Sequence, residues 1–588
     1  MLNKIIAFLT FTVAFYCSAE TVVRLTPVAV EQHQLQVEIE ISDLNRETLQ
    51  FAMPVWRTGR YEQLDFASAM TNLNVVDGNG QPLSVTAISD HKWRAELTSP
   101  SAVVIRYLLT ADELAMRTRH LDESHLFLDF AAAVVAVEGA QDKPYRVELN
   151  VPKHWQIRSG LKQGESANSL VADNYQQLID SPVEAGEHEF RSFEFQGAQF
   201  ELVVWGHTPA NLDKLNADIK KLVVASYQLW GSFPFSKYVF MVHATDNIRG
   251  GTEHLNSTIM QWDRFKFNDP ENYLDFMGLV AHEFVHTWNV KAYRPAAFVP
   301  YDLNHRHHST LLWLAEGSTS YLQEKLLLTS GLMNETKYYQ RLAKRLSRHQ
   351  ATPGGSHQSV ADSSWYKWHQ HGGQHGHNFD ANIYQEGFAA TLALDFWLLQ
   401  NSGHQAGVAA LHRLLYELFS LPNGLTEGQV QHAMAELVGE QADVGQWWQQ
   451  HIDSPLAVDW IELLAQAGLE NEAKSKPNYW LGARLQAAPE GLKVGAVSTQ
   501  SPAWMAGLSQ GDRIIAVDGF AVHSGNFERI QHSWDAGQTL QLHLFRQGIL
   551  TKREVTLASP QGLINKLKVA PKTSPEADAL RQAWLGNR

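Results

Sequence analysis

The sequence predicts a multidomain α+β protein in which a β-rich part, a mostly helical part and a second strand-rich part follow one another. Three observations carry this prediction. The first two hundred residues contain stretches such as Leu35–Ile41, where apolar and polar residues alternate as in a half-buried strand. From Asn211 onward, apolar residues recur at helical spacing, and short strand-like stretches with turns return after Pro477. With 588 residues, the chain is long enough for several domains, each with its own core.

Residues 1–19 have the pattern of a secretory signal peptide. Lys4 supplies the positive charge, an apolar run follows to Tyr16, and Cys17-Ser-Ala19 offers small residues for cleavage. We therefore expect export across the inner membrane and a periplasmic location. Cys17 raises the alternative of a lipoprotein, but a lipidated cysteine normally follows a small residue and here follows a tyrosine. The apolar run is too short to span a membrane, and no later segment has eighteen uninterrupted apolar residues, so we expect no membrane span.

The remaining chain divides by its residue pattern into four parts. Residues 20–205 are predicted to form an N-terminal β domain resembling a sandwich, with turn signals such as Asp77-Gly-Asn-Gly80 between strands. Residues 206–470 are predicted to be a mostly helical domain with a helical tail, and residues 476–560 a domain of short strands. Residues 561–588 form a C-terminal tail. Helices are expected at 212–229, 271–291, 309–328, 334–349, 384–401 and 404–419, with a polar loop at 354–380.

Composition excludes several classes of function. The chain is 44% apolar and 19% charged, with a formal net charge of -14, which argues against a nucleic-acid surface and against a polybasic membrane anchor. Cys17 is the only cysteine, so the mature chain would have no thiol nucleophile and no cysteine-based zinc site.

One stretch carries a recognisable metal-binding pattern, His282-Glu283-Phe-Val-His286. In a helix the two histidines lie one turn apart on the same face, and two imidazoles at that spacing can hold one zinc ion. Glu283 can then act as the general base that takes a proton from the attacking water. The alternative is a chance match on an ordinary core helix. Asp269 followed by Pro270 gives a helix start signal upstream, which favours the helix.

A catalytic zinc needs three protein ligands and one open position, so a third ligand should come from another element. The best candidate is Glu316, the acid in an apolar helical stretch, where an unpaired carboxylate would be costly. The alternative is a structural glutamate held in a salt bridge. Histidines nearby in the sequence could compete as ligands, although loop histidines are more often solvated: His305, His307, His308, His369, His371, His375 and His377.

Two further stretches suggest that the protein handles a peptide substrate. Gly250 and Gly251 would let a peptide backbone approach closely, and Glu253 at a strand end could bind a charged α-amine. Tyr384 at the start of a helix could donate a hydrogen bond to the oxyanion that forms on the carbonyl. The alternatives are a tight turn with an exposed acid, and a tyrosine at the edge of the core.

These motifs resemble the PDZ-bearing glycyl aminopeptidase family of gluzincin metallopeptidases. The resemblance rests on the His282–His286 motif, the Leu312–Tyr321 stretch around Glu316, Gly250–His254, Ser181-Pro-Val-Glu184 and Met53–Tyr61, and it covers most of residues 25–560. It implies that His282, His286 and Glu316 bind one zinc ion per chain, Glu283 is the general base, Glu253 anchors the α-amine and Tyr384 stabilises the transition state.

The resemblance also implies the architecture: an N-terminal β domain, a thermolysin-like catalytic domain and a C-terminal PDZ domain. Ser501–Leu508 and Gly511–Gly519 independently match the core of bacterial PDZ domains, which bind a peptide C-terminus, and the alternative is a module that only packs on the catalytic domain. The chain departs from the family in two places: Glu386 precedes Gly387 where the family usually has lysine, and residues 369–377 are rich in histidine.

The function expected from the sequence is removal of N-terminal residues, small ones such as Gly or Ala, from peptides with a free N-terminus. Two alternatives remain. A zinc endopeptidase would cleave internal bonds, and the Gly250–Glu253 motif argues against it. A non-catalytic exported protein would capture peptides through its PDZ domain, and the complete set of His282, Glu283, His286 and Glu316 argues against that, since a binder needs no general base.

Overall fold

The computed structural model describes residues 20–44, 46–97, 101–369, 371–472, 479–559 and 563–586. The predicted signal peptide lies outside these residues. The chain forms two compact units: Met1–Arg57 with Gln63–His188, and Thr58–Glu62 with Glu189–Arg588. The short segment Thr58–Glu62 therefore belongs to the second unit, although its neighbours on both sides belong to the first.

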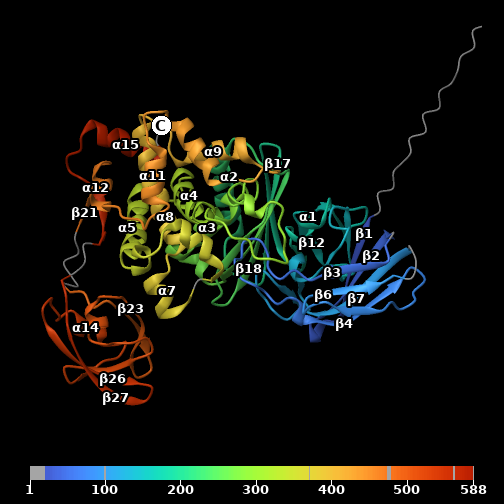
Figure 1. Ribbon diagram of the computed structural model, residues 1–588, viewed down its shortest axis with the longest axis horizontal. Coiled ribbons are helices and arrows are strands. Elements are labelled where there is room, and N and C mark those ends of the chain that lie inside the picture. Colours follow the sequence, from blue (N-terminus) through green and yellow to red (C-terminus); the bar gives the residue numbers. More distant parts are fainter. Residues whose placement is uncertain are drawn as a thin grey trace, which may run out of the picture. The chain divides into compact units, whose positions relative to one another are not determined.

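The first unit is built from three sheets, coloured blue to teal in Figure 1. Their orders are β13-β14-β11-β1-β2-β7-β4, β10-β3-β6-β5 and β12-β15-β9-β8. The strands are β1 (Thr21–Ala29), β2 (Gln34–Leu44), β3 (Thr48–Ala52), β4 (Met70–Asp77), β5 (Val85–Ala87), β6 (Lys92–Glu96), β7 (Ser101–Thr110), β8 (Arg119–Leu121), β9 (His125–Leu128), β10 (Ala136–Val137), β11 (Tyr145–Leu149), β12 (Gln156–Ser159), β13 (Lys162–Gln163), β14 (Ser169–Ala172) and β15 (Val183–Gly186), with one short helix, α1 (Tyr175–Ile179).

Alternation along β2 shows why these strands form. Leu35, Val37, Ile39 and Ile41 are all buried and face the core, as a period of two requires. On the opposite face Glu38 and Glu40 each lie 2.9 Å from the Arg24 guanidinium of β1. These two faces give the strand one register, because a slip of one residue would exchange them.

The second unit combines a five-stranded sheet with a layer of helices. The sheet order is β16-β17-β18-β20-β19, from β16 (Glu189–Phe195), β17 (Ala198–Trp205), β18 (Lys237–Thr245), β19 (Gly250–Glu253) and β20 (Ser257–Asp263). The helices are α2 (Leu212–Trp230), α3 (Pro270–Val285), α4 (Ser318–Thr329), α5 (Glu335–Gln350), α6 (Val360–Trp365), α7 (Gly373–Phe379), α8 (Ile383–Asn401), α9 (Val408–Phe419), α10 (Glu427–Val438), α11 (Val444–His451) and α12 (Trp460–Ala465). A π-helix, Trp313–Gly317, leads into α4.

Two sequence expectations need correction here. Residues 354–380 are not a plain loop, since they contain α6 and α7; Ser359 caps α6 by accepting a hydrogen bond from the backbone N–H of Asp362. The helix expected to reach residue 291 ends at Val285, and a series of turns follows, in which Val290 has a φ of 113°. A residue with that backbone angle cannot continue a right-handed helix.

The C-terminal part contains a separate sheet and a returning segment. The sheet, ordered β22-β23-β24-β26-β27 with β25 beside β24, surrounds its own apolar core. Its elements are β22 (Ala483–Ala488), β23 (Gly491–Val497), α13 (Pro502–Met505), β24 (Arg513–Val517), β25 (Phe520–Ala521), α14 (Phe527–Gln531), β26 (Thr539–Arg546) and β27 (Ile549–Thr556). After it, β28 (Leu567–Val569) pairs with β21 (Leu469–Asn471), and α15 (Pro575–Leu585) packs on α8 and α4.

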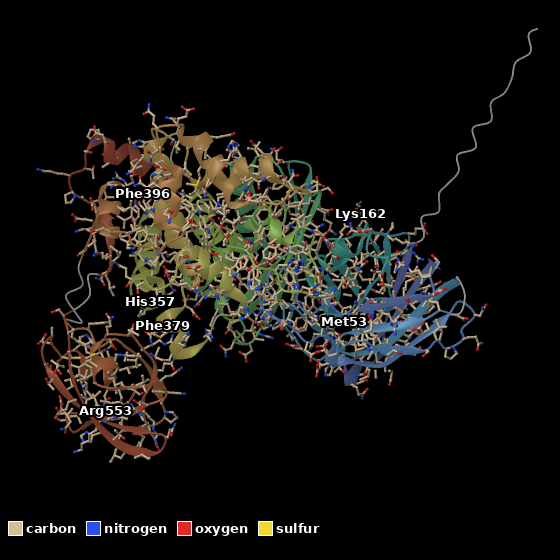
Figure 2. All side chains as sticks on the ribbon, viewed as in Figure 1. Met53, Lys162, His357, Phe379, Phe396 and Arg553 are labelled. Carbon is tan, nitrogen blue, oxygen red and sulfur yellow. The ribbon has the colours of Figure 1, made fainter. Side chains whose placement is uncertain are left out.

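Helix α15 is a structural part of the helical layer. The Trp584 ring is 1% exposed and lies 5.1 Å from the ring of Phe396, which Figure 2 shows on α8. Its indole N–H donates to the hydroxyl of Tyr321 on α4. In the described part of the chain, no helix has the combination of length and apolar character that a membrane crossing requires.

Candidate metal and catalytic site

Helix α3 carries His282 and Glu283, and His286 is its C-cap residue. Asp269 caps the helix by accepting a hydrogen bond from the backbone N–H of Asn272, and Pro270 occupies the first turn, as predicted from the sequence. At the other end, His282 and His286 lie one turn apart, with their Nε2 atoms 3.2 Å from each other.

Each histidine is oriented by a hydrogen bond at its other ring nitrogen. His282 Nδ1 lies 2.9 Å from the side-chain oxygen of Gln323, and His286 Nδ1 lies 2.9 Å from the backbone oxygen of Asn289. Both partners are acceptors, so Nδ1 carries the proton and donates. The two Nε2 atoms are then the ones that can bind a metal, which is the usual arrangement of an oriented metal-ligating histidine.

Glu316 comes from the π-helix, and the fold brings it to the two histidines. Its Oε2 lies 3.4 Å from His286 Nε2 and 3.7 Å from His282 Nε2, and the side chain is almost fully buried. Single π-turns inside helices are often found at functional sites. Asn289 connects this turn to α3, because its side-chain N–H₂ donates to the backbone oxygen of Leu314 and to the hydroxyl of Thr319.

These three donors suit a zinc ion. Two imidazole nitrogens and one carboxylate oxygen converge at buried positions, and a catalytic zinc site takes three protein ligands of these types. Burial lowers the pKa of His282, and the two neighbouring imidazoles hold the pKa of Glu316 well below its usual range despite its burial. Burial likewise acts to lower the pKa of His286, but the carboxylates of Glu316, Glu253 and Glu283 outweigh it and raise that pKa to about 9. The local field therefore favours positive charge at this position.

Strand β19 places the carboxylate of Glu253 beside that of Glu283. Glu253, Glu283 and His286 form a buried group whose candidate ligand atoms all lie within 4.8 Å of one another. Gly251 permits this arrangement, since a Cβ built there would stand 2.3 Å from Oε1 of Glu283. Strand β19 is also the edge of its sheet, after β20. An edge strand can pair with an extended peptide, so β19 is suited to align a substrate.

Tyr384 and Glu386 lie on the first turn of α8. The Tyr384 ring lies 6.3 Å from the ring of His282 and is partly exposed. Asn382 caps the helix by accepting from the backbone N–H of Tyr384. Glu386, where the chain departs from the family pattern, is buried and lies 3.0 Å from Nδ1 of His349 on α5. Its charge therefore has a partner on a neighbouring helix.

Tyr61 and Gln323 lie at the site but were not singled out by sequence reasoning. The Tyr61 hydroxyl donates to Glu316 Oε1 at 3.2 Å, and burial together with Glu316 and Glu253 raises its pKa well above the usual value. The only signal for Tyr61 in the sequence was the Met53–Tyr61 stretch, which carried the family resemblance but no role. Beside it, a Cβ on Gly59 would stand 2.3 Å from Oε1 of Glu253. The segment Thr58–Glu62 therefore forms one wall of the site.

The competing histidines lie in other groups. His305 and His307 contact Asp302, and His308 contacts the backbone oxygen of Trp365. His371 and His375 form a separate cluster with Asp380. Within the described residues, none of these histidines belongs to the group formed by His282, His286 and Glu316.

Comparisons with known proteins agree with this architecture. The family model for the Peptidase M61 N-terminal domain matches residues 23–187, that for M61 glycyl aminopeptidase matches residues 275–389, and that for a PDZ domain matches residues 480–557. The search of curated proteins gives no match.

One solved structure gives the same result for the fold, and two less similar ones are also matched. An aminopeptidase N family protein from Idiomarina loihiensis is 29% identical, with a TM-score of 0.89, over 96% of this chain and 100% of that one. An M1 zinc metallopeptidase from Deinococcus radiodurans is 12% identical, with a TM-score of 0.46, over 74% of this chain and 93% of that one. A variant of that protein bound to a Tyr-Ser-Ala substrate is 12% identical, with a TM-score of 0.47, over 75% of this chain and 95% of that one.

The fold and the comparisons define a metallopeptidase hydrolase. The chain matches the models of the M61 N-terminal domain, of M61 glycyl aminopeptidase and of a PDZ domain, so the family resemblance predicted from its motifs is confirmed. The multidomain α+β architecture predicted from the sequence is confirmed as well.

Proposed function

We propose that the protein is a zinc-dependent aminopeptidase that removes small N-terminal residues, of the Gly or Ala type, from peptides. The observation that carries this proposal is the position of Glu253 within 4.8 Å of Glu283 and His286. In an N-terminal residue, the α-amine and the scissile carbonyl are separated by a single Cα. An amine anchor for exo-cleavage must therefore stand directly beside the catalytic group, as Glu253 does.

Charge supports the same proposal. Glu253, Glu283 and Glu316 are each 2 to 4% exposed, and carboxylates buried this deeply are stable only when they face cations. One zinc ion held by His282, His286 and Glu316 would supply Lewis acidity and a bound water whose pKa lies near about 7. The ammonium group of a substrate would neutralise Glu253.

The residues of this chain then have separate roles in the proposed reaction. Glu283 accepts the proton of the attacking water and passes it to the leaving amine. Glu253 holds the substrate ammonium and fixes the register of the peptide. The Tyr384 hydroxyl donates a hydrogen bond to the oxygen that becomes negative as the carbonyl is attacked.

The experiment that tests this function compares Gly-, Ala- and Leu-amide substrates, free and N-acetylated, with metal-quantified mature protein. We expect turnover of the free amines only, fastest for Gly or Ala, with about one zinc per chain at this site. Glu253→Gln should reduce kcat/KM on free amines by about 10² or more while leaving bound metal unchanged. Turnover of the acetylated substrates would instead indicate an endopeptidase. Absence of turnover with zinc bound would indicate a peptide-binding protein.

We further propose that the protein is exported to the periplasm and that its PDZ domain binds peptide C-termini. Strand β22 stands at the edge of its sheet and directly follows Leu481-Gly482, so a peptide could add beside it. N-terminal sequencing of protein recovered from the periplasm should begin at Glu20. Binding of a peptide acid but not of its C-terminal amide would establish the PDZ role, and equal binding of both would contradict it.

A further inference from the structure

A second cluster of metal-binding side chains lies in the first unit, on the hairpin of β8 and β9. Cross-strand pairs place His120 opposite Phe127, and Phe127 opposite Glu184 of β15. Paired residues of a sheet point to the same face, and so does a residue two positions further along a strand. His120, His125 and Glu184 are therefore directed to one face by the strand register.

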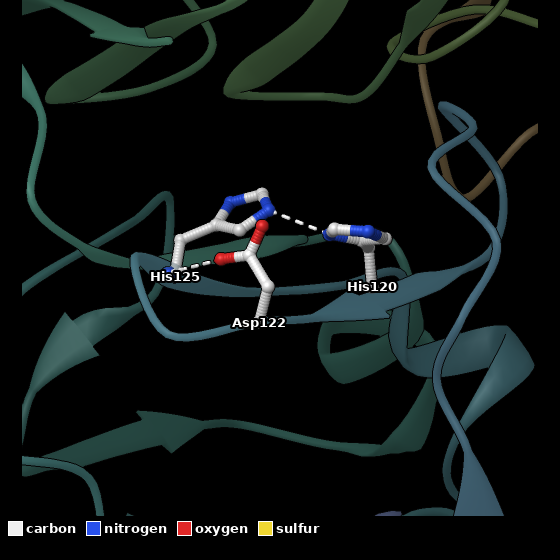
Figure 3. Close-up of side chains that lie close together, drawn as sticks. All are labelled: His120, Asp122 and His125. Carbon is white, nitrogen blue, oxygen red and sulfur yellow. Dashed lines mark hydrogen bonds between the residues drawn. The ribbon is translucent and has the colours of Figure 1, made fainter. Parts of the chain in front are cut away.

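The contacts agree with that register. His120 Nδ1 lies 2.8 Å from His125 Nε2, and His125 Nδ1 lies 2.8 Å from Glu184 Oε1. Figure 3 shows a nitrogen of each ring directed at the other ring, with the Asp122 carboxylate beside them. The candidate ligand atoms of His120, Asp122 and His125 all lie within 4.8 Å of one another. Two imidazoles and one carboxylate are the donor types found in the proposed catalytic site.

Two of the three donors, His125 and Asp122, are held in place by the surrounding chain. The carboxylate of Glu184 is buried and accepts the Nδ1–H of His125, leaving the lone pair of Nε2 directed at the cluster. Asp122 accepts through Oδ1 from the backbone N–H groups of Ser124 and His125, which fixes the plane of its carboxylate. Pre-oriented donors with a carboxylate behind one histidine are typical of built metal sites.

We propose that His120, Asp122 and His125 form a second metal site, which takes zinc or a similar divalent transition metal. The site has three protein ligands and a fourth position for water, with Glu184 positioning His125. Two nitrogens bound to one tetrahedral zinc lie about 3.3 Å apart, so the rings must separate by about 0.5 Å from their present distance. His120 can make this movement because it is only partly buried, while His125 is fully buried. The bound ion would join the β8–β9 turn to the sheet, and it takes no part in the proposed peptidase reaction.

The competing description is a metal-free chain of hydrogen bonds from His120 through His125 to Glu184. In that chain His120 donates to His125, and His125 donates to Glu184, so all three groups are satisfied without an ion. The two descriptions differ in one measurable respect, the number of metal equivalents that the folded chain binds.

The test is equilibrium dialysis of the full chain against zinc, followed by metal analysis. We expect two equivalents per chain for the wild type and one for His120→Gln and for Asp122→Asn, both at partly exposed positions. His286→Gln should also bind one equivalent, and its double variant with His120→Gln none. Two control variants should keep both equivalents: His154→Gln, an exposed histidine of the same unit, and His371→Gln, from the other histidine cluster.

A second readout separates lost ligands from lost folding. With His286→Gln as background, zinc should raise the melting temperature, and His120→Gln should abolish that rise without changing the metal-free melting temperature by more than a few degrees. One equivalent in the wild type, lost only with His286, would overturn the proposal and leave the hydrogen-bonded chain. Loss of the second equivalent in His371→Gln, with His120→Gln unaffected, would overturn it as well.

Discussion

Glu283 and Glu253 have the same type of side chain, and at the residue scale their different surroundings support the different roles proposed for them. Glu283 follows a proposed metal ligand on α3, while Glu253 ends the edge strand β19 and faces Gly59. The glycines are as important as the acids. Gly251 leaves space for the carboxylate of Glu283, and Gly59 leaves space for that of Glu253. In each case a Cβ on the glycine would lie 2.3 Å from the carboxylate Oε1.

Replacing Glu283 by Gln should separate metal binding from catalysis. The amide has nearly the same shape but cannot accept the proton of the attacking water, so we expect kcat to fall by about 10² to 10⁴. Zinc content should stay at the wild-type value, because the side chain is not one of the three proposed ligands. The measurement is steady-state turnover of Gly-amide beside metal analysis; unchanged kcat would remove Glu283 from the mechanism.

Gly59→Ala tests whether the Thr58–Glu62 segment shapes the amine site. The added methyl group would displace Glu253, so we expect kcat/KM on free-amine substrates to fall by about 10². Gly80→Ala is a matched control, since Gly80 has a φ of +80° against +81° for Gly59 but nothing within 4 Å of its Cβ position. Both variants carry a backbone cost of about 1 to 2 kcal/mol, so only the steric effect differs. Equal activity in the two variants would contradict the role of Gly59.

At the element scale, the site depends on how α3, the π-helix and α8 meet. A Cβ on Gly317 would stand 2.3 Å from the Cα of Gly387, so the π-helix and α8 are in direct backbone contact. That contact sets the distance between Glu316, just before Gly317, and Tyr384, one turn before Gly387. Asn289 makes the corresponding connection between the turn after α3 and the π-helix.

Asn289→Ala should weaken metal binding without removing a ligand. The variant loses the hydrogen bonds to the π-helix, which leaves Glu316 less well oriented, and losses of this kind typically cost 10- to 100-fold in metal affinity. Zinc competition with a chelator measures the change. Asn304→Ala, at an exposed asparagine of a loop, is the control and should keep the wild-type affinity. Identical affinity in both variants would show that the π-helix holds Glu316 without this connection.

At the scale of the whole molecule, buried charges connect the helical layer. Glu324 on α4 is 1% exposed and lies 2.7 Å from both Arg341 and Arg345 of α5. Burial acts to raise its pKa, but the two guanidinium groups outweigh burial and lower the pKa from 4.5 to about 2. The same layer extends to the C-terminus, where Trp584 packs on α8 and bonds to Tyr321 of α4.

Acid should therefore destabilise the second unit through Glu324. Because its folded pKa is depressed, its contribution to the free energy of unfolding is present above pH 4.5 and is lost as the pH falls toward about 2. The lost contribution is on the order of 3 kcal/mol. Urea denaturation at several pH values measures it. Glu324→Gln should be less stable at neutral pH and should show a smaller decline across this window; an equally steep decline would assign the acid sensitivity to other groups.

Local spacing is the part of the site that the sequence by itself determined. His282 and His286 share a face of α3 because four residues make about one turn of any α-helix, and the cap at Asp269 is read from neighbouring letters. The alternation in β2 likewise predicts which side chains face the core. Glu316 is predicted as the third metal ligand because a lone acid in an apolar helix needs a partner. The spacing of residues in the sequence does not show which residues that partner group contains.

Tertiary structure alone decided the contacts between residues far apart in the chain. Tyr61 reaches Glu316 across 255 residues, and Glu386 finds His349 on another helix. The tail after the PDZ domain returns to place Trp584 beside Tyr321, 263 residues away. His120 and Glu184 share a face because of strand register. None of these pairs has a sequence signal, because periodicity reports only on neighbours within one helix or strand, whereas long-range contacts follow from packing the whole chain.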